Sequence, residues 1–255
     1  MGNFFKKIID KITDDSADEM FPTEHKTQLE VDLHSHLIPG IDDGAATIED
    51  SIAMIWRLKL LGYKKLITTP HIMSHRYPNT SRDIKIALYK LQKELKRRRI
   101  DIKIEVAAEY YFDPHFIELL ESRDILTFGN KHLLFEMSYG LRPVGFEEGI
   151  YKMKSLGYQP VLAHPERYLF MQGNITGYEK IKSLGVLFQM NINSLGGYYG
   201  EGARNTVNEL ISRGMVDFIG SDTHKVRHLE RMTEVFKSMD YQNIFTHNTI
   251  LNNSL

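Results

Sequence analysis

The chain contains no cysteine among its 255 residues. Disulfide bonds, thiolate metal ligands and a cysteine nucleophile are therefore all excluded. A protein without cysteine fits most simply in a reducing compartment, and we expect this one in the cytoplasm.

The sequence also lacks an excess of charge of either sign. Lys and Arg total 32 against 33 Asp and Glu, which leaves a formal net charge of -1. No overall basic field favours nucleic acid as a partner, and the cationic run KRRR at 96–99 lies where an expected helix ends and complements its dipole. We therefore predict no nucleic-acid partner.

Long apolar runs are absent as well. No run approaches the roughly 20 residues that cross a bilayer, so we expect no membrane-spanning segment. The first residues, MGNFFKKIIDKI, instead alternate apolar side chains and lysines at helical spacing, without the apolar core of a secretory signal. We interpret residues 1–27 as an amphipathic arm. A helix packed on the protein, a mobile helix, and a helix that docks on a membrane surface or a partner all fit this pattern.

What the sequence does contain is a regular alternation of β-rich apolar stretches and helical patterns. No linker and no internal repeat interrupts it, so we predict a single domain at 28–255, of the α/β class, with parallel βαβ units closing into a barrel. The helical patterns lie near 47–62, 84–95, 114–121, 144–156, 176–184 and 202–213. The seven β-rich stretches are 29–33, 64–69, 102–109, 132–138, 159–164, 186–193 and 216–224.

Potential metal ligands stand at the ends of these stretches. In a parallel barrel the carboxyl ends of all strands meet at one face, where functional sites are built. These side chains are therefore expected to meet in one pocket, although they are distant in sequence. They are His34, His36, His71, Glu109, Glu136, His164, Asp222 and His224.

Local spacing supports this interpretation. His34 and His36 would project to the same side of an extended segment, and Asp222 and His224 repeat that spacing. A proline after His164 would bias that histidine toward the extended region. His71 likewise follows a proline, so both histidines would stand on stiff chain.

A single buried histidine is more often a hydrogen-bonded core residue than a ligand. The set is different, because five histidines and four carboxylates, with Asp43 as the fourth acid, would be costly to bury without cations. Two divalent ions would balance the four carboxylates, whereas three would leave a positive surplus suited to a phosphate ester dianion. A donor set of imidazole and carboxylate fits Mn, Fe, Co or Zn.

Six ordered motifs resemble the polymerase-and-histidinol-phosphatase (PHP) superfamily. They are DLHSHLIPGIDDG, TTPH, AAE, LLFEM, LAHPERY and GSDTH, and they extend over about residues 30–225. Within that superfamily the chain most resembles the bacterial manganese-dependent protein tyrosine phosphatases of capsule and exopolysaccharide synthesis, which act on the associated tyrosine kinase.

The resemblance implies a distorted (β/α)7 barrel with three divalent ions, manganese first among the candidates. Arg167 of HPER would lie beside the phosphate, and Asp42 would stay outside the ligand set. One ion would be held by His34, His36, Glu109 and Asp222, a second by Glu109, Glu136 and His164, and the third by Asp43, His71 and His224.

The implied reaction is hydrolysis of phosphotyrosine on a protein by a hydroxide shared between two metals. A phenol has a pKa of about 10 and leaves readily, so no general acid is assigned. The expected partner is a membrane-associated tyrosine kinase, which makes the inner face of the membrane a second expected location.

Three alternatives remain at this point. One is a small-molecule phosphatase of the histidinol-phosphate type, which would have a closed pocket with an acid for the amine, whereas a peptide needs an open mouth. Another is a non-catalytic, metal-stabilised PHP module such as those attached to replicative polymerases. The third, a PHP-type exonuclease, is disfavoured by the balanced charge.

The loop 194–200, SLGGYYG, could supply aromatic side chains to a rim that recognises a phenyl ring.

Overall fold

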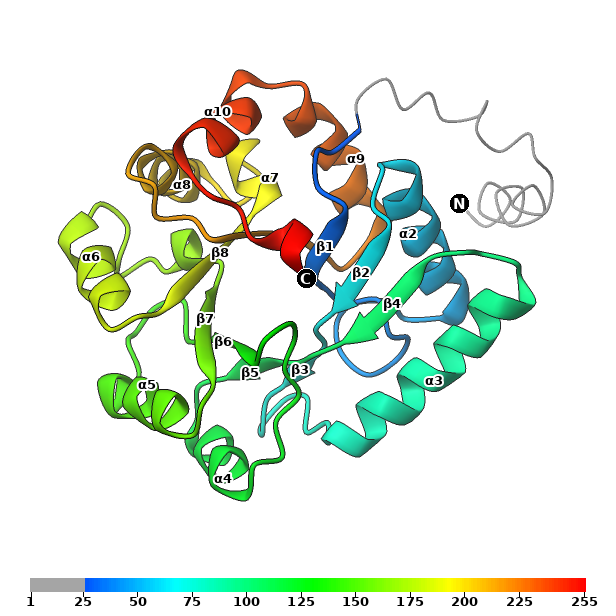
Figure 1. Ribbon diagram of the computed structural model, residues 1–255, viewed down its shortest axis with the longest axis horizontal. Coiled ribbons are helices and arrows are strands. Elements are labelled where there is room, and N and C mark those ends of the chain that lie inside the picture. Colours follow the sequence, from blue (N-terminus) through cyan, green and yellow to red (C-terminus); the bar gives the residue numbers. More distant parts are fainter. Residues whose placement is uncertain (1–25) are drawn as a thin grey trace.

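The computed structural model describes residues 26–255, in which nine strands form a single sheet with parallel pairing throughout. Figure 1 shows the sheet as a ring with helices around its outside. The predicted arm at 1–27 lies almost wholly outside the described residues. The strands are β1 (Val31–Ser35), β2 (Lys65–Thr68), β3 (His71–Ile72), β4 (Lys103–Val106), β5 (Glu109–Tyr111), β6 (His132–Glu136), β7 (Gln159–Ala163), β8 (Leu187–Asn191) and β9 (Phe218–Thr223).

The ring closes because two of its members are interrupted strands. β2 and β3 are separated only by Thr69 and Pro70, and β4 and β5 only by Ala107 and Ala108. β2 pairs with β4, β3 with β5, and β9 returns to β1. Proline cannot donate to a sheet ladder, which accounts for the first interruption. If β2 with β3 and β4 with β5 are each counted as one interrupted strand, the sheet is a seven-stranded parallel barrel. The predicted distorted (β/α)7 architecture is therefore confirmed.

The helices surround the barrel. Every helix that the sequence predicts within residues 28–255 is present, but the short α7 was not predicted, and two more, α9 and α10, follow the last predicted motif. The signal for α9 was available, because Leu229, Met232 and Phe236 recur at helical spacing and are buried. The helices are α2 (Ile48–Leu60), α3 (Ser81–Arg97), α4 (Pro114–Ser122), α5 (Phe146–Ser155), α6 (Ile175–Ser183), α7 (Ile192–Leu195), α8 (Glu201–Ser212), α9 (Val226–Phe236) and α10 (Met239–His247), with short 3-10 turns η2 (Pro165–Arg167) and η3 (Asn252–Ser254).

Capping residues in the sequence mark where the helices begin. Thr47 and Asp50 form a reciprocal capping box at α2, and Asp113 caps α4 directly before Pro114. No helix among residues 26–255 combines the length and the apolarity that a bilayer crossing requires.

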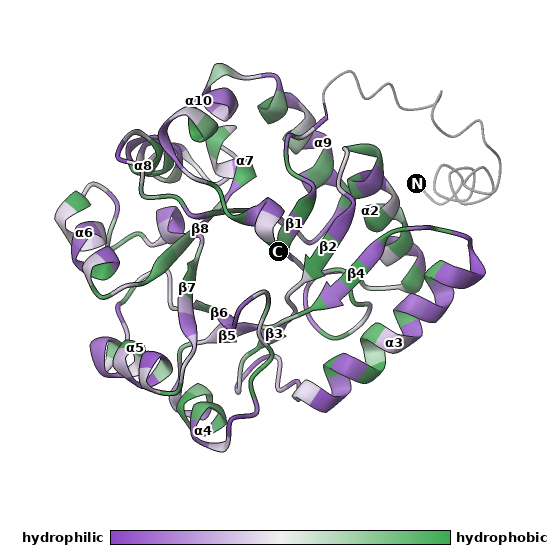
Figure 2. Cartoon of the chain, in the orientation of Figure 1, coloured by the Kyte–Doolittle hydropathy of each residue, from purple (hydrophilic) through white to green (hydrophobic). Residues whose placement is uncertain are grey.

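Apolar side chains fill both sides of the sheet. Figure 2 shows green segments in strands such as β2 and β8, while β4 also carries purple. The larger cluster lies between sheet and helices, and a smaller one consists of side chains such as Leu33, Ile67 and Phe218. Leu251 and Leu255 pack against this smaller cluster. In Figure 1 the C-terminus accordingly lies near the centre of the ring.

Asn252 fastens the C-terminal segment to the barrel. Its side chain is fully buried, donates to the carbonyls of Val31 (3.0 Å) and Ile219 (2.7 Å), and accepts from Ile219 N (2.9 Å).

We expect Asn252→Ala to lower the free energy of unfolding by about 3 kcal/mol, because three buried backbone groups lose their partners. Urea denaturation measures this loss. The exposed neighbour is the control: Asn253→Ala is expected to change stability by about 0.5 kcal/mol or less, and equal losses would contradict the role given to Asn252.

Candidate metal centre

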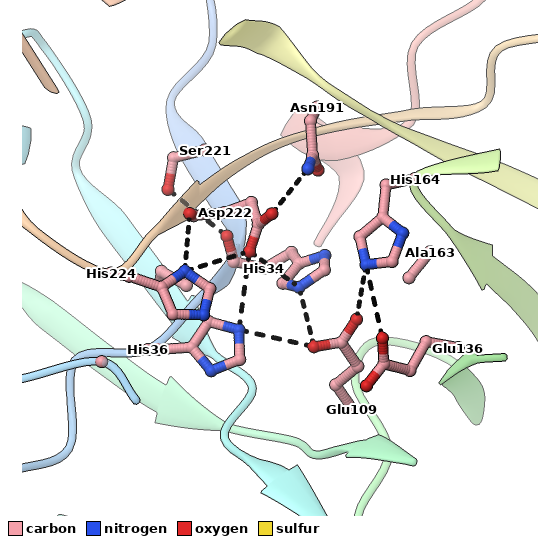
Figure 3. Close-up of polar contacts among 12 residues, drawn as sticks. His34, His36, Glu109, Glu136, Ala163, His164, Asn191, Ser221, Asp222 and His224 are labelled. Carbon is pink, nitrogen blue, oxygen red and sulfur yellow. Dashed lines mark hydrogen bonds and ion pairs between the residues drawn. The ribbon is translucent and has the colours of Figure 1, made fainter. Parts of the chain in front are cut away.

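All nine predicted ligands lie at the carboxyl end of the barrel, and Figure 3 shows the side chains of His34, His36, Glu109 and Asp222 turned toward one another. They form four groups in which one nitrogen or oxygen atom from each residue lies within 4.8 Å of the others. Several residues belong to two groups, so the groups are continuous. The groups are His36, Asp43, His71 and His224; His34, His36 and Asp222; His34, Glu109 and His164; and His71, Glu109 and Glu136.

Glu109 is central to the cluster. Its Oε2 lies 3.1 Å from His34 Nε2 and 3.1 Å from His71 Nδ1. Its Oε1 lies 2.9 Å from His164 Nε2. Because its two oxygens face different imidazoles, this carboxylate has the geometry of a group that can contact two ions.

The set predicted for the third ion is also brought together. Asp43 Oδ1 lies 3.5 Å from His71 Nε2 and 3.5 Å from His224 Nε2. The other nitrogen of His71 lies 3.1 Å from Glu136 Oε1. The structure adds one feature, because His36 shares a group with these residues as well as with His34 and Asp222.

The backbone at three of these residues differs from the prediction. His34, His164 and Asp222 have φ angles of 74°, 34° and 46°, in the left-handed region. His34 is therefore not extended, contrary to the prediction from alternation, and the register between β1 and β9 shifts there. The same prediction is wrong for Asp222, and the proline after His164 does not keep that histidine extended. Such conformations cost on the order of 1–3 kcal/mol each and are typical of functional sites. Here they turn the side chains toward the centre.

Two glycines allow the chain to pack closely behind the histidine pair. A Cβ on Gly44 would lie 2.2 Å from the carbonyl oxygen of His36, and one on Gly220 would lie 2.9 Å from the Cβ of His34. Neither position has room for a side chain. Gly44, the glycine of the DDG motif, is therefore needed for close packing against the backbone of His36.

Two polar side chains orient the same histidines. Asp42 Oδ2 lies 2.8 Å from His36 Nδ1, and Gln189 Oε1 lies 2.6 Å from His34 Nδ1. Each contact occupies Nδ1 and directs Nε2 to the centre, as outer partners of metal-binding histidines do. Asp42 thus supports the cluster from outside, in line with its exclusion from the ligand set.

Buried atoms without partners show that this donor set fits a cation. Among the described residues, these atoms include His34 Nε2, His36 Nε2, His71 Nδ1, Glu109 Oε2 and Glu136 Oε1. Buried polar atoms are nearly always hydrogen-bonded, so five unpaired atoms at one place need an explanation. A divalent ion that accepts nitrogen and oxygen ligands provides one.

Arg167 lies at the edge of the cluster, in the η2 turn. Its Nη1 donates to Asp222 Oδ2 at 2.9 Å. Its guanidinium carbon lies 4.6 Å from the ring centre of Tyr139 and 4.2 Å from that of Tyr199. Tyr139 and Arg167, together with Tyr77, line a cavity of about 360 Å³ to which seven of the nine candidate ligands contribute. The arginine therefore faces the space where a substrate would meet the cluster.

Comparison with known proteins places this fold and site in a family. The family described as "Capsular polysaccharide synthesis, CpsB/CapC" matches residues 30–249, which is most of the chain. The chain belongs to the CpsB/CapC family. CapC of Staphylococcus aureus is 26% identical over 197 residues, covering 77% of each chain. The tyrosine-protein phosphatase YwqE of Bacillus subtilis is 28% identical over 198 residues, covering 77% of this chain and 78% of YwqE.

A solved structure has the same fold as this CpsB/CapC chain. It comes from work on YwqE of Bacillus subtilis and CpsB of Streptococcus pneumoniae, described as unique metal-dependent tyrosine phosphatases. The TM-score is 0.74 at 26% identity, and the match covers 86% of this chain and 96% of the other.

The pKa values of the buried acids and histidines in the CpsB/CapC site depend on two opposing effects, burial and the charges of neighbouring groups. Burial alone would raise the pKa of Glu109, but His34 and His71 outweigh burial and hold that pKa well below its usual range. Burial alone would lower the pKa of His34, yet the carboxylates of Glu109 and Asp222 raise it to about 9. Protons can therefore compensate the acids where cations do not, so protons and metal ions compete for this site.

Sequence reasoning missed Gln189, Asn191 and Tyr139, whereas Tyr199 lies in the loop 194–200 that the sequence offered as an aromatic rim. Asn191 donates to Asp222 Oδ2 at 2.6 Å, and Tyr199 donates to the same oxygen at 3.3 Å. Gln189 and Asn191 had a signal, because both are amides inside an otherwise apolar strand. Tyr139 had none, since it lies in a loop between β6 and α5.

Proposed function

We propose that this CpsB/CapC protein is a metal-dependent protein-tyrosine phosphatase. The observation that carries the proposal is the set of unpaired, buried imidazole and carboxylate atoms at one end of the barrel, beside a cavity that Arg167 lines. The names of YwqE and its relatives support the same reaction.

We propose three divalent ions, manganese in the cell, with iron, cobalt and zinc as the other candidates. When bound, such ions lower the pKa of water by several units and offset the charge of a phosphate. The ligands would be His34, His36, Glu109 and Asp222 for one ion, Glu109, Glu136 and His164 for the second, and Asp43, His71 and His224 for the third. The third set lies within one of the four groups described above. The first two sets each combine members of different groups that are in pairwise contact.

The chain's own residues orient the substrate. Arg167 is the catalytic residue outside the ligand set, because its guanidinium can donate to nonbridging phosphate oxygens and offset the charge that develops on them. Tyr139 and Tyr199 stack on the guanidinium and limit its rotation. A departing phenolate has a pKa of about 10 and needs no strong acid.

The side chains that line the cavity favour phosphotyrosine over histidinol phosphate. Every acid that lines it, namely Asp43, Glu109, Glu136 and Asp222, belongs to the candidate ligand set. Among residues 26–255, no lining acid remains to pair with the amine of histidinol. Tyr77, Tyr111 and Tyr139 line the same cavity and suit a phenyl ring.

We further propose that residues 28–255 form the catalytic domain and that 1–27 form a separate amphipathic arm. The proposed substrate is phosphotyrosine on a membrane-associated tyrosine kinase of capsule or exopolysaccharide synthesis. The enzyme would then act in the cytoplasm or peripherally at the inner face of the membrane. The family's description as capsular polysaccharide synthesis proteins supports this context.

Substrate and metal can be tested together. The protein is stripped with a chelator, reloaded separately with Mn, Fe, Co or Zn, and supplied with a phosphotyrosyl peptide or with histidinol phosphate. We expect phosphate release from the peptide and recovery with manganese. Turnover of histidinol phosphate alone would refute the substrate, and turnover of neither by the fully loaded protein would favour a non-catalytic metal module.

Removing the arginine tests its role in the reaction. We expect Arg167→Ala to lower kcat/KM for a phosphotyrosyl peptide by about a hundredfold to a thousandfold, as loss of a donor to a developing charge does. Arg167→Lys should recover only part of this, because lysine lacks the planar fork. Arg213→Ala, which removes an exposed arginine paired with Glu179 and Glu209, is the control. Activity unchanged in Arg167→Ala would show that this arginine does not contact the phosphate.

A further inference from the structure

Exposed apolar side chains occur in two loops that also contribute residues to the lining of the cavity. Among the described residues, eight large hydrophobic side chains are exposed, and four of them belong to the loop that contains Tyr139 and the segment that follows Arg167, both of which line the cavity. These four, here called the mouth patch, are Tyr139 (38% exposed), Leu141 (75%), Val144 (100%) and Leu169 (66%). Apolar side chains grouped on a surface mark interaction sites, whereas scattered ones need no explanation.

The two loops of the mouth patch are joined. Leu169 N donates to the carbonyl oxygen of Tyr139 at 2.8 Å, which links the segment after η2 to the loop between β6 and α5. The charged side chain of this loop, Arg142, is engaged elsewhere: it lies 2.5 Å from Glu147 and over the ring of Phe146. The patch is therefore an anchored and largely uncharged surface.

The mouth patch is continuous with the reaction site. Tyr139 belongs to both, since it lines the cavity and lies 4.6 Å from the guanidinium of Arg167. Leu169 follows Arg167 by two residues. A polypeptide whose phosphotyrosine enters the cavity would extend across this surface, because neighbouring residues of an extended chain lie about 3.3–3.6 Å apart.

The side chains of the mouth patch indicate which kind of molecule it binds. An anionic membrane surface requires lysines or arginines around the apolar side chains, and the only such side chain within 138–145 is paired with an acid. Apolar side chains of a peptide require no charge. We propose that the mouth patch binds an apolar side chain of the polypeptide that carries the phosphotyrosine, within a few residues of it. This inference rests on the proposed function and makes a protein segment, in preference to a free phosphate ester, the substrate.

A substitution series tests the proposal in the metal-loaded, full-length protein. The variant combines Leu141→Ser, Val144→Ser and Leu169→Ser, which alter exposed side chains and leave the cavity intact. Its substrates are two phosphotyrosyl peptides that differ only in leucine or serine beside the phosphotyrosine, and p-nitrophenyl phosphate. The unaltered protein should prefer the leucine peptide about tenfold or more in kcat/KM. The variant should lose that preference through a higher KM, with kcat and the hydrolysis of p-nitrophenyl phosphate unchanged.

Exposed apolar residues elsewhere give the matched control. Tyr151→Ser and Met239→Ser remove side chains that are also exposed but lie on α5 and α10. This variant should keep the peptide preference. An equal loss in both variants would overturn the proposal, as would a retained preference in the mouth-patch variant.

The outcomes separate the two proposals. If p-nitrophenyl phosphate and both peptides are hydrolysed with no dependence on the patch, the patch proposal is wrong and the proposed function stands. If the fully loaded protein hydrolyses none of them, both are wrong. A change in oligomeric state on sedimentation, with KM unchanged, would show that the patch binds a second copy of the chain and would also overturn the proposal.

Discussion

Glu109→Gln is expected to abolish phosphatase activity, with kcat/KM reduced at least about a thousandfold. The reason is the position of this carboxylate, whose two oxygens lie 2.9–3.1 Å from nitrogens of His34, His71 and His164. An amide keeps the shape but removes the negative charge and offers one oxygen in place of two. Ions that the carboxylate holds in common would then be lost or misplaced.

Three measurements distinguish this effect from misfolding. They are kcat/KM with a phosphotyrosyl peptide, bound metal by elemental analysis, and thermal unfolding. We expect less bound metal in Glu109→Gln and retained cooperative unfolding. Glu105→Gln is the control, because Glu105 stands on β4, part of the same interrupted strand, and pairs at the surface with Lys65 and Lys103. If Glu109→Gln kept full activity, the proposed metal centre would be wrong.

Chelation is expected to lower the melting temperature by about 8–16 °C relative to the metal-loaded protein. An ion present at a thousand times its dissociation constant stabilises the folded state by about 4 kcal/mol, and each kcal/mol shifts a domain of this size by about 2–4 °C. The physical origin is the cluster itself, in which Glu109, Glu136 and several imidazoles are buried with unpaired atoms.

Metal specificity supplies the control for this thermal shift. Manganese added back to the stripped protein should restore the melting temperature. Calcium, which prefers oxygen ligands alone, should restore much less at the same concentration, because five of the nine donors are imidazoles. A melting temperature that does not respond to chelation and reloading would contradict a metal centre in the fold.

Much of the site could be predicted because its signals are local. A β-rich stretch ending in histidine or acid is visible in the sequence, and parallel strands direct all such ends to one face. The residue types at 34, 36, 109 and 222 therefore predicted both a barrel and a pocket without knowledge of which strand neighbours which. The pairing of β9 with β1, which closes the barrel, is what brings Asp222 beside His34.

Local reasoning failed where tertiary packing overrides backbone preference. His164 precedes Pro165 and should be extended, yet it has a φ of 34°. Its backbone N donates to the carbonyl oxygen of Gln189 at 2.7 Å, and its ring contacts Glu109. Neither interaction can be deduced from neighbouring residues, because both join different strands. Strain of this kind persists only when the surrounding structure compensates for it.

The sequence by itself determined the class of fold, the identity of the nine candidate ligands and the kind of cation they suit, since these depend on residue type, order and period. Only the tertiary structure decided which ligand atoms face one another, that Gln189 and Asp42 direct the histidine pair, and that Arg167 lies between Tyr139 and Tyr199. It likewise decided that Leu141, Val144 and Leu169 are exposed, and that a hydrogen bond from Leu169 N to the carbonyl oxygen of Tyr139 joins the two loops that carry them. The physical reason is that these contacts form across strands and loops distant in sequence, where closure of the barrel sets distances that no local pattern encodes.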